Sequence, residues 1–149
     1  MIRLTAAQAR LIEKLAIAAW PKECCGLLIG RRAEAGLLVD EVRPCKNLLA
    51  DQENDRFEID PQERFDAMRQ ARSMEREILG HYHSHPNGVA APSKTDREQM
   101  YEPELTWLIV GVTKAGDCRL AAFRPNLERE DFDPVGLVIG SADDQNCRS

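Results

Sequence analysis

The three histidines of the chain lie within five positions, at His81, His83 and His85. Alternate residues of a β-strand face the same side, so a strand through this segment would present all three imidazoles together. Neutral imidazole is a common ligand for zinc and related metals. A short H-x-H pair is also compatible with a surface strand whose polar side chains face water. The residues that follow must therefore distinguish a metal site from such a surface strand.

An acid at the start of a helix supplies a third donor. Ser93-Lys94-Thr95-Asp96 has the S-x-x-D form of a capping box, which would hold the Ser93 hydroxyl and the Asp96 carboxylate on one helical turn. Two histidines from a strand end and one such carboxylate make three ligands with a fourth position open, as in catalytic zinc sites. The pattern is therefore typical of a catalytic metal site built from two of the histidines and Asp96.

Other metal motifs built on histidine do not fit this sequence. Pro86-Asn87-Gly88 follows His85, which interrupts the H-x-H-x-D-H pattern of metallo-β-lactamase-like enzymes. The P-C-x-x-C of zinc deaminases and the helical H-E-x-x-H are both absent. Cupins place an acid within a few residues of H-x-H, whereas the next acid here is Asp96.

The order of these motifs resembles the JAMM (MPN-plus) zinc metalloproteases, small stand-alone prokaryotic type. That family has an upstream glutamate, then H-x-H followed by proline, a loop and S-x-x-D. Here the corresponding residues are Glu23, His83-Ser84-His85-Pro86 and Pro92-Ser93 with Asp96. The segment from Pro21 to Gly30 also resembles the family's glutamate-to-glycine strand. The resemblance runs from about Thr5 to Phe123.

The resemblance implies that His83, His85 and Asp96 bind Zn²⁺, with His81 packing beside them. It also implies a function and roles for two further residues. Glu23 would accept a proton from the zinc-bound water and pass it to the leaving amine, and Ser93 would hydrogen-bond the oxyanion. The substrate would be a peptide or isopeptide bond after the C-terminal tail of a ubiquitin-like or sulfur-carrier protein. Two other classes stay open, a metal-bound scaffold without turnover and a small-molecule amidase. The presence of Glu23 and Ser93 favours the enzyme, while the oligomeric state stays undetermined.

Hydrophobic periodicity predicts a mixed α/β fold with one central sheet flanked by helices. Thr5 and Gln8 form a T-x-x-Q capping box, and Pro61 stands at a first helical position after Asp60. The second helix is expected to turn Phe65, Met68, Ala71 and Arg72 to the core. Helices are predicted over 5–19, 61–74 and 93–101, and strands over 24–30, 37–43, 57–59, 77–82, 105–112 and 117–123, the last two as a hairpin.

Composition limits the partners and the domain organisation. The net charge is −5, and residues 126–149 carry six acids and two bases, so the rest of the chain is nearly neutral. Because the chain has no excess of positive charge, broad affinity for nucleic acids is not expected. Residues 1–125 are predicted to form the domain, and 126–149 an acidic extension with an edge strand over 135–139 and then a flexible tail. No apolar run reaches the roughly 18 residues of a membrane span.

The five cysteines are an odd number without regular spacing, which favours a reducing, cytoplasmic compartment. Cys24, Cys25 and Cys118 lie in apolar runs. We therefore expect these three to be small buried hydrophobic residues rather than reactive or metal-binding thiols.

Overall fold

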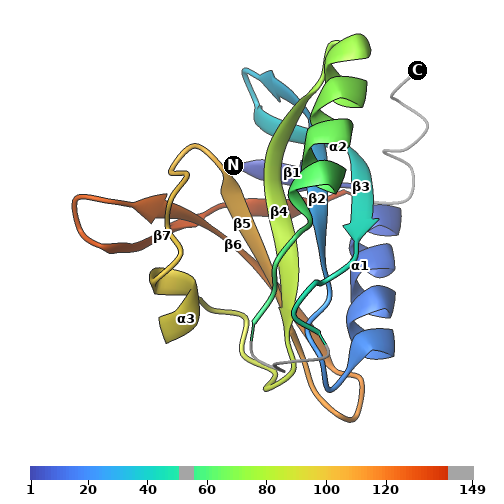
Figure 1. The fold of residues 1–149 in the computed structure, drawn as a ribbon, viewed down its shortest axis with the longest axis vertical. Coiled ribbons are helices and arrows are strands. Elements are labelled where there is room, and N and C mark those ends of the chain that lie inside the picture. Colours follow the sequence, from blue (N-terminus) through green and yellow to red (C-terminus); the bar gives the residue numbers. More distant parts are fainter. Residues whose placement is uncertain (51–55, 141–149) are drawn as a thin grey trace.

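The computed structural model describes residues 1–50 and 56–140, which form one eight-stranded mixed sheet (Figure 1). The strand order is β7-β6-β5-β4-β2-β3-β1-β8. Strand β4 pairs with β5 in parallel, and β1 pairs in parallel with both β3 and β8, whereas the other neighbours are antiparallel. The strands are β1 Ile2–Leu4, β2 Cys25–Ala33, β3 Gly36–Cys45, β4 Glu77–His85, β5 Thr106–Val112, β6 Cys118–Asn126, β7 Asp131–Val135 and β8 Leu137–Ile139.

The helices begin where the capping residues predict. In α1, Ala6–Ala19, the Thr5 hydroxyl accepts a hydrogen bond from the Gln8 amide at 3.1 Å, and the Gln8 side chain accepts one from the Thr5 amide at 2.9 Å. In α2, Pro61–Ser73, the Asp60 carboxylate accepts from the Gln62 amide. The third helix, α3, is a single turn over Lys94–Arg97 and is shorter than the predicted 93–101.

Helices α1 and α2 cover opposite faces of the sheet. On one face, Ile12 of α1 packs in a core cluster with Leu28 and Tyr82. On the other face, Ala67 and Ala71 of α2 pack with Leu27 and Ile29. Adjacent residues of β2 thus point to opposite layers, as strand alternation requires. The histidines at odd positions of β4 share the α2 side, because Leu27 is registered with His81 and Cys25 with His83.

Two predictions on the α2 side are wrong. Residues 57–59 make no strand, since Ile59 forms only an isolated bridge with Asn47. Phe65 is 49% exposed, with the Arg69 guanidinium 5.9 Å from its ring centre, rather than in the core. The reason is that α2 approaches the sheet through two alanines, and a helix seated on small side chains turns its larger residues outward.

Strands at both edges of the sheet complete the domain. β1 precedes α1, in a position where no strand is predicted, and β8 pairs with it at the position of the predicted 135–139 edge strand. β7 lies at the opposite edge against β6. Residues 141–149, predicted as a flexible tail, fall outside the described residues, as does Cys147.

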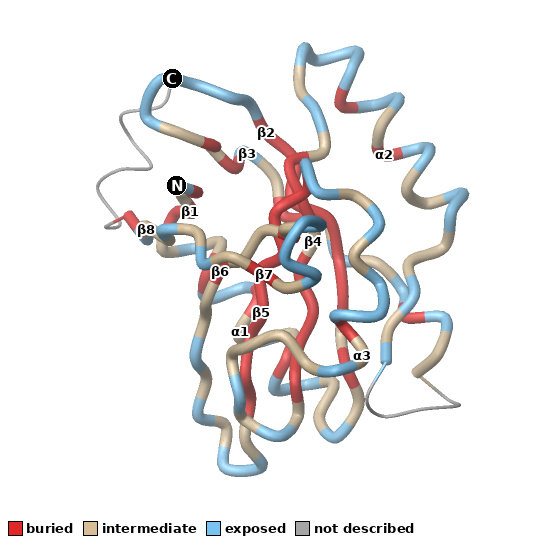
Figure 2. Tube along the Cα trace, turned by 90° about the vertical axis from the view of Figure 1, so that its left-hand side faces the viewer, coloured by how far each residue is buried: buried red, intermediate tan, exposed pale blue. Residues whose placement is uncertain are grey.

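Burial is concentrated in the central strands (Figure 2). Every residue of β5 is buried, including Trp107. In α2, by contrast, only Ala67 and Ala71 are buried. In the part of the chain that the structure describes, no helix has the length and apolar character to cross a membrane.

Strand β4 can approach β5 closely because residue 80 has no side chain. A Cβ atom on Gly80 would lie 2.0 Å from the backbone oxygen of Thr106. We expect Gly80→Ala to lower the free energy of unfolding by about 3 kcal/mol, because backbone must move to relieve the overlap. Chemical denaturation measures this loss. Gly116→Ala is the matched control, since its Cβ meets nothing within 4 Å and only its φ of +90° is strained, which costs about 1 kcal/mol. Equal losses would contradict the argument.

Candidate metal centre

Strand β4 places two of the three histidines, His83 and His85, at its carboxyl end. His83 is registered between Cys25 of β2 and Ile109 of β5 and is completely buried. His85 is 5% exposed. Ser84 points to the opposite face, and its hydroxyl accepts a hydrogen bond of 2.8 Å from the Cys24 amide. The two imidazoles therefore stand side by side on a rigid central strand.

The α3 capping box fixes the predicted third ligand. The Ser93 hydroxyl accepts a hydrogen bond of 3.0 Å from the Asp96 amide, and the Ser93 amide donates one of 2.9 Å to Asp96 Oδ2. Asp96 is 5% exposed. The capping box that begins α3 therefore also orients the Asp96 carboxylate.

Donor atoms of these three residues converge on one point. His83 Nε2 lies 2.9 Å from His85 Nε2 and 3.2 Å from Asp96 Oδ1, and His85 Nε2 lies 3.1 Å from Asp96 Oδ2. Ligands at about 2.0–2.1 Å from a tetrahedral ion are separated from each other by roughly 3.4 Å. Two imidazole nitrogens and a carboxylate at these separations fit a zinc-type ion, with little movement needed to admit it.

The two imidazoles are held by different neighbours. His85 Nδ1 lies 3.0 Å from the carbonyl oxygen of Val89 and donates to it, which leaves Nε2 as the coordinating atom. The ring of His83 stacks on Phe57, with centroids 4.3 Å apart and an interplanar angle of 17°. Among the described residues, His83 Nδ1 has no hydrogen-bond partner. Ring stacking rather than a second hydrogen bond orients His83.

The electrostatics of the site favour ligand forms of His83 and Asp96. Burial lowers the pKa of His83 despite the nearby Asp96, so this imidazole is neutral. Burial would raise the pKa of Asp96, but hydrogen bonds from His83 and His85 outweigh it and hold that pKa far below its usual range. For His85, hydrogen bonding to Asp96 outweighs burial and raises the pKa. Metal ligands must be neutral imidazoles and ionised carboxylates, and a bound cation would displace the proton from His85.

Glu23 also lies close to the two histidines. It is 4% exposed, and one of its carboxylate oxygens lies within 4.8 Å of the His83 and His85 ligand nitrogens. Asp96 approaches the same nitrogens to 3.1–3.2 Å. Asp96 therefore supplies a carboxylate close to both nitrogens, and Glu23 supplies a second buried carboxylate near the same two nitrogens. Glu23, His85 and Ser93 line one small cleft of about 120 Å³ with Pro86 and Asn87.

Two further hydrogen bonds, besides that from the Cys24 amide to Ser84, connect α1 and the Glu23 segment to the end of β4. The Trp20 indole donates to the Pro86 carbonyl at 3.0 Å. The Ser84 amide donates to the Cys24 carbonyl, also at 3.0 Å. Residues sixty positions apart in the sequence are thereby fixed against each other, with Glu23 between the two anchors.

The structure adds Asn47, a residue for which the sequence predicted no role. Its side chain, 7% exposed, donates to the carbonyls of Glu23 and Arg56 and accepts from the amides of Leu49 and Glu58, each at 3.0 Å. All four hydrogen-bonding positions of the amide are used. Asn47 therefore holds the backbone of Glu23 against the segment that carries Phe57. An asparagine at the start of a polar loop is too common a feature to have revealed this.

Replacing Asn47 by alanine is expected to lower the free energy of unfolding by about 2–3 kcal/mol, because buried backbone groups lose their partners. If the variant folds, activity should fall as Glu23 shifts. Urea denaturation and steady-state kinetics measure both effects. Asn126→Ala, which removes a contact to Asp133 near the β7 edge, is the control and should leave turnover unchanged. A stable Asn47→Ala with normal turnover would show that the anchor is dispensable.

The remaining sequence-predicted residues lie outside the convergent set. His81 packs edge-on against Trp107, with ring centroids 4.5 Å apart, and lines a separate pocket. Burial, followed by the nearby His83, lowers the pKa of His81 to about 3. Cys25 is buried as predicted, whereas Cys24 and Cys118 are only partly buried, and all of these are free thiols. Burial raises the pKa of Cys24 and of Cys118, so both are protonated.

Several solved structures share this fold. Protein DSY2949 from Desulfitobacterium hafniense is 32% identical, with a TM-score of 0.81 over 95% of this chain and 94% of that one. AF2198, a JAB1/MPN domain protein from Archaeoglobus fulgidus, is 18% identical, with a TM-score of 0.58 over 94% of this chain and 99% of that one. At that level of identity the second comparison shows the fold alone.

Curated relatives match part of the chain. A protein named desampylase from Haloferax volcanii is 34% identical over 60% of this chain and 62% of its own length. Tail tip assembly protein K of Escherichia phage N15 is 31% identical over 83% of this chain and 49% of its own. The chain thus spans less than two thirds of these relatives. Residues 5–124 match the family described as prokaryotic homologs of the JAB domain. The chain belongs to this family of prokaryotic JAB domain homologs.

Proposed function

We propose that this protein is a zinc-dependent hydrolase that cleaves the amide bond after the C-terminal tail of a ubiquitin-like or sulfur-carrier protein. The observation that carries the proposal is the convergence of His83, His85 and Asp96 within 3.2 Å of one another, with Glu23 beside them. Three ligands leave a coordination position for water, which is how catalytic zinc sites differ from structural ones.

Zinc bound by His83, His85 and Asp96 would lower the pKa of a water molecule toward 7 and so supply a nucleophile. The other steps belong to side chains. Glu23 accepts the proton of the attacking water and delivers it to the leaving amine. Ser93 accepts a hydrogen bond from the Asp96 amide, which leaves its own O–H free to donate to the oxyanion. One such donor is typically worth about 10²–10³ in rate.

Two kinds of support favour a protein tail as the substrate. The motif order resembles proteases that act on ubiquitin-like proteins, and two relatives, from Haloferax volcanii and Pyrococcus furiosus, are named desampylases. A Gly-Gly tail has no side chains to bind, so affinity must come from main-chain hydrogen bonds and from the carrier's folded surface. A free Gly-Gly-Cys peptide should therefore be a far poorer substrate than a whole carrier.

Incubating the zinc-loaded protein with carrier fusions that end in Gly-Gly-X tests the proposal. Mass spectrometry should show cleavage after the second glycine, and a chelator should abolish it. Zinc binding without cleavage of any fusion would favour a scaffold without turnover. Hydrolysis of small amides but of no fusion would instead favour a small-molecule amidase.

A further inference from the structure

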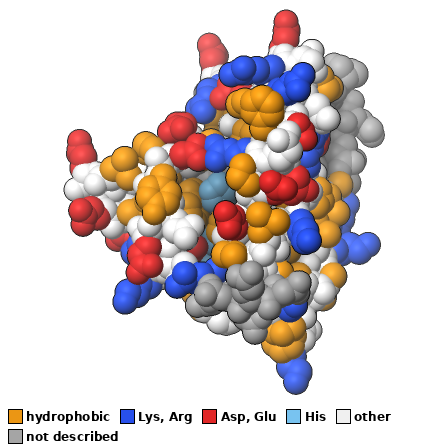
Figure 3. Space-filling view, viewed as in Figure 1, with side chains coloured by type: hydrophobic (Ala, Val, Ile, Leu, Met, Phe, Trp, Pro, Cys, Tyr) orange, Lys and Arg blue, Asp and Glu red, His pale blue; other side chains and the backbone are white. Residues whose placement is uncertain are grey.

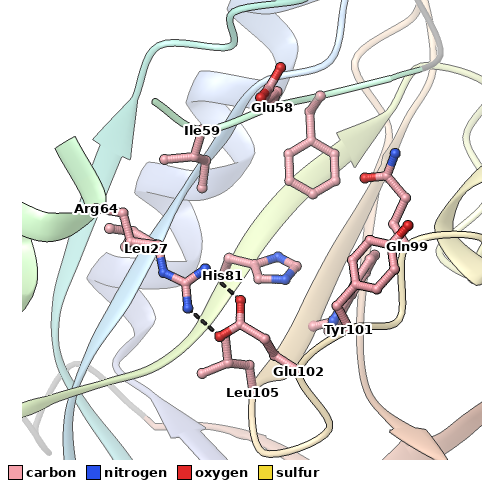
Figure 4. Close-up of a pocket in the computed structure, with 11 residues that line it drawn as sticks. Leu27, Glu58, Ile59, Arg64, His81, Gln99, Tyr101, Glu102 and Leu105 are labelled. Atoms are coloured by element: carbon pink, nitrogen blue, oxygen red, sulfur yellow. Dashed lines mark hydrogen bonds and ion pairs between the residues drawn. The ribbon is translucent and has the colours of Figure 1, made fainter. Parts of the chain in front are cut away.

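A second pocket, here called the side pocket, opens on the sheet face that carries the histidines. It lies between α2 and the segment 99–105, and its lining includes Leu27, His81 and Trp107. Figure 4 shows Leu27 and His81 among the residues around the pocket. Figure 3 shows a histidine at the bottom of a hollow on this face, bordered by acidic and apolar side chains. The volume of the side pocket is about 190 Å³. A cavity of about 150 Å³ accepts a benzene ring, so this one has room for one large side chain.

The side pocket adjoins the metal centre. Phe57 lines the pocket and also stacks on His83, with ring centroids 4.3 Å apart. The ring centroids of His81, in the pocket lining, and His83, in the metal centre, are 6.4 Å apart. An extended peptide advances about 3.3–3.6 Å per residue. Two glycines therefore cover the distance from the metal centre, and the first substrate side chain to reach the pocket belongs to the residue before Gly-Gly.

The pocket combines apolar walls with an excess of negative charge. Phe57, Tyr101 and Trp107 supply aromatic surface. Its charged lining residues are Arg64, Glu58 and Glu102, which gives a net charge of −1. Both nitrogens of the Arg64 guanidinium fork bind the Glu102 carboxylate across the opening, as the dashed lines in Figure 4 mark. Arg64 is thereby neutralised, whereas Glu58 is exposed and, among the residues that the structure describes, forms no such ion pair.

We propose that the side pocket binds a basic side chain, arginine or lysine, from the substrate residue just before Gly-Gly. The inference rests on the proposed function and names a determinant of its specificity. The aliphatic stem of such a side chain packs on the aromatic walls, and its cationic end reaches Glu58 and the unused lone pairs of Glu102. An acidic side chain would be repelled by the net negative charge of the pocket. A purely apolar side chain would fill the pocket without forming an ion pair.

The test measures binding and does not depend on turnover. Fluorescently labelled peptides Ala-Val-X-Gly-Gly-Ala, with X as arginine, leucine or glutamate, are titrated against the zinc-loaded full chain carrying Glu23→Gln. Fluorescence anisotropy gives each Kd. We expect the arginine peptide to bind about two- to fivefold more tightly than the leucine peptide, the range of a partly exposed ion pair. The glutamate peptide should bind most weakly.

Charge reversal at Glu58 should reverse the preference. In the same background, Glu58→Lys makes the pocket net positive and is expected to favour the glutamate peptide over the arginine peptide. Glu34→Lys makes the same charge change on the exposed β2–β3 turn and should leave the order unaltered. Equal Kd values for the three peptides, no binding up to millimolar concentration, or an arginine preference that survives Glu58→Lys would overturn the proposal.

The binding data separate this inference from the proposed function. If wild-type protein hydrolyses no carrier but the arginine preference and its reversal are observed, the side pocket stands and the hydrolase is rejected. If carriers are cleaved at equal rates whichever residue precedes Gly-Gly, and the peptides bind equally, the side pocket alone is rejected.

Discussion

Changing Asp96 to alanine is expected to release nearly all the zinc from the protein, whereas the wild type should hold about one ion per chain. Two imidazoles alone leave a tetrahedral site two ligands short of closure. Loss of even an outer contact to a ligand costs about 10–100-fold in metal affinity, so loss of the ligand itself should cost more. Elemental analysis after dialysis against a weak chelator measures the retained zinc.

Asp96 also caps α3, so a second variant must separate metal loss from misfolding. Asp96→Asn keeps the size of the side chain and an oxygen for the Ser93 amide, but removes the charge. It should fold with wild-type circular dichroism and still bind zinc poorly. Asp117→Asn, on the β5–β6 hairpin, is the matched control and should retain zinc. A wild type that takes up no zinc, or an Asp96→Asn variant that holds it fully, would refute the ligand assignment.

The candidate site was more predictable than its surroundings because its rules are local. Strand alternation alone places His83 and His85 on one face, and the S-x-x-D pattern alone orients Asp96. Each rule operates within four residues. That the end of β4 and the start of α3 meet could be inferred only from the resemblance. No local sequence pattern predicts the distance that the 86–92 loop leaves between this strand and this helix.

What the sequence did not predict depends on contacts between distant segments. Strand β1 is three residues long and is a strand only because β3 and β8 pair with it. Phe57 has the alternation of a strand, yet it leaves the sheet to stack on His83. The hydrogen bonds of Asn47 connect residues up to 24 positions apart. Hydrophobic periodicity in the sequence contains no information about such distant partners. The conformations of these residues are therefore set by tertiary contacts.

The placement of Glu23 is the most consequential long-range result, and it leads to the second large effect. Glu23→Gln preserves the size and hydrogen-bonding capacity of the side chain but removes its basic oxygen. We expect turnover to fall by about 10²–10⁴, the usual contribution of a positioned general base. Zinc content and melting temperature should remain near wild type, because Asp96, which contacts both histidine nitrogens, is retained in this variant.

Glu34→Gln and Glu41→Gln provide controls for this change. Glu34 lies exposed on the β2–β3 turn, and Glu41 forms a surface ion pair with Arg43 at 2.7 Å. Neither substitution should alter turnover. Full activity in Glu23→Gln would mean that the zinc-bound water needs no base from this position. Loss of zinc in Glu23→Gln would make the buried Glu23 carboxylate a fourth ligand, and a site closed by four protein ligands would leave no position for water. Steady-state kinetics combined with metal analysis on the same preparations therefore distinguishes a general base from a ligand at residue 23.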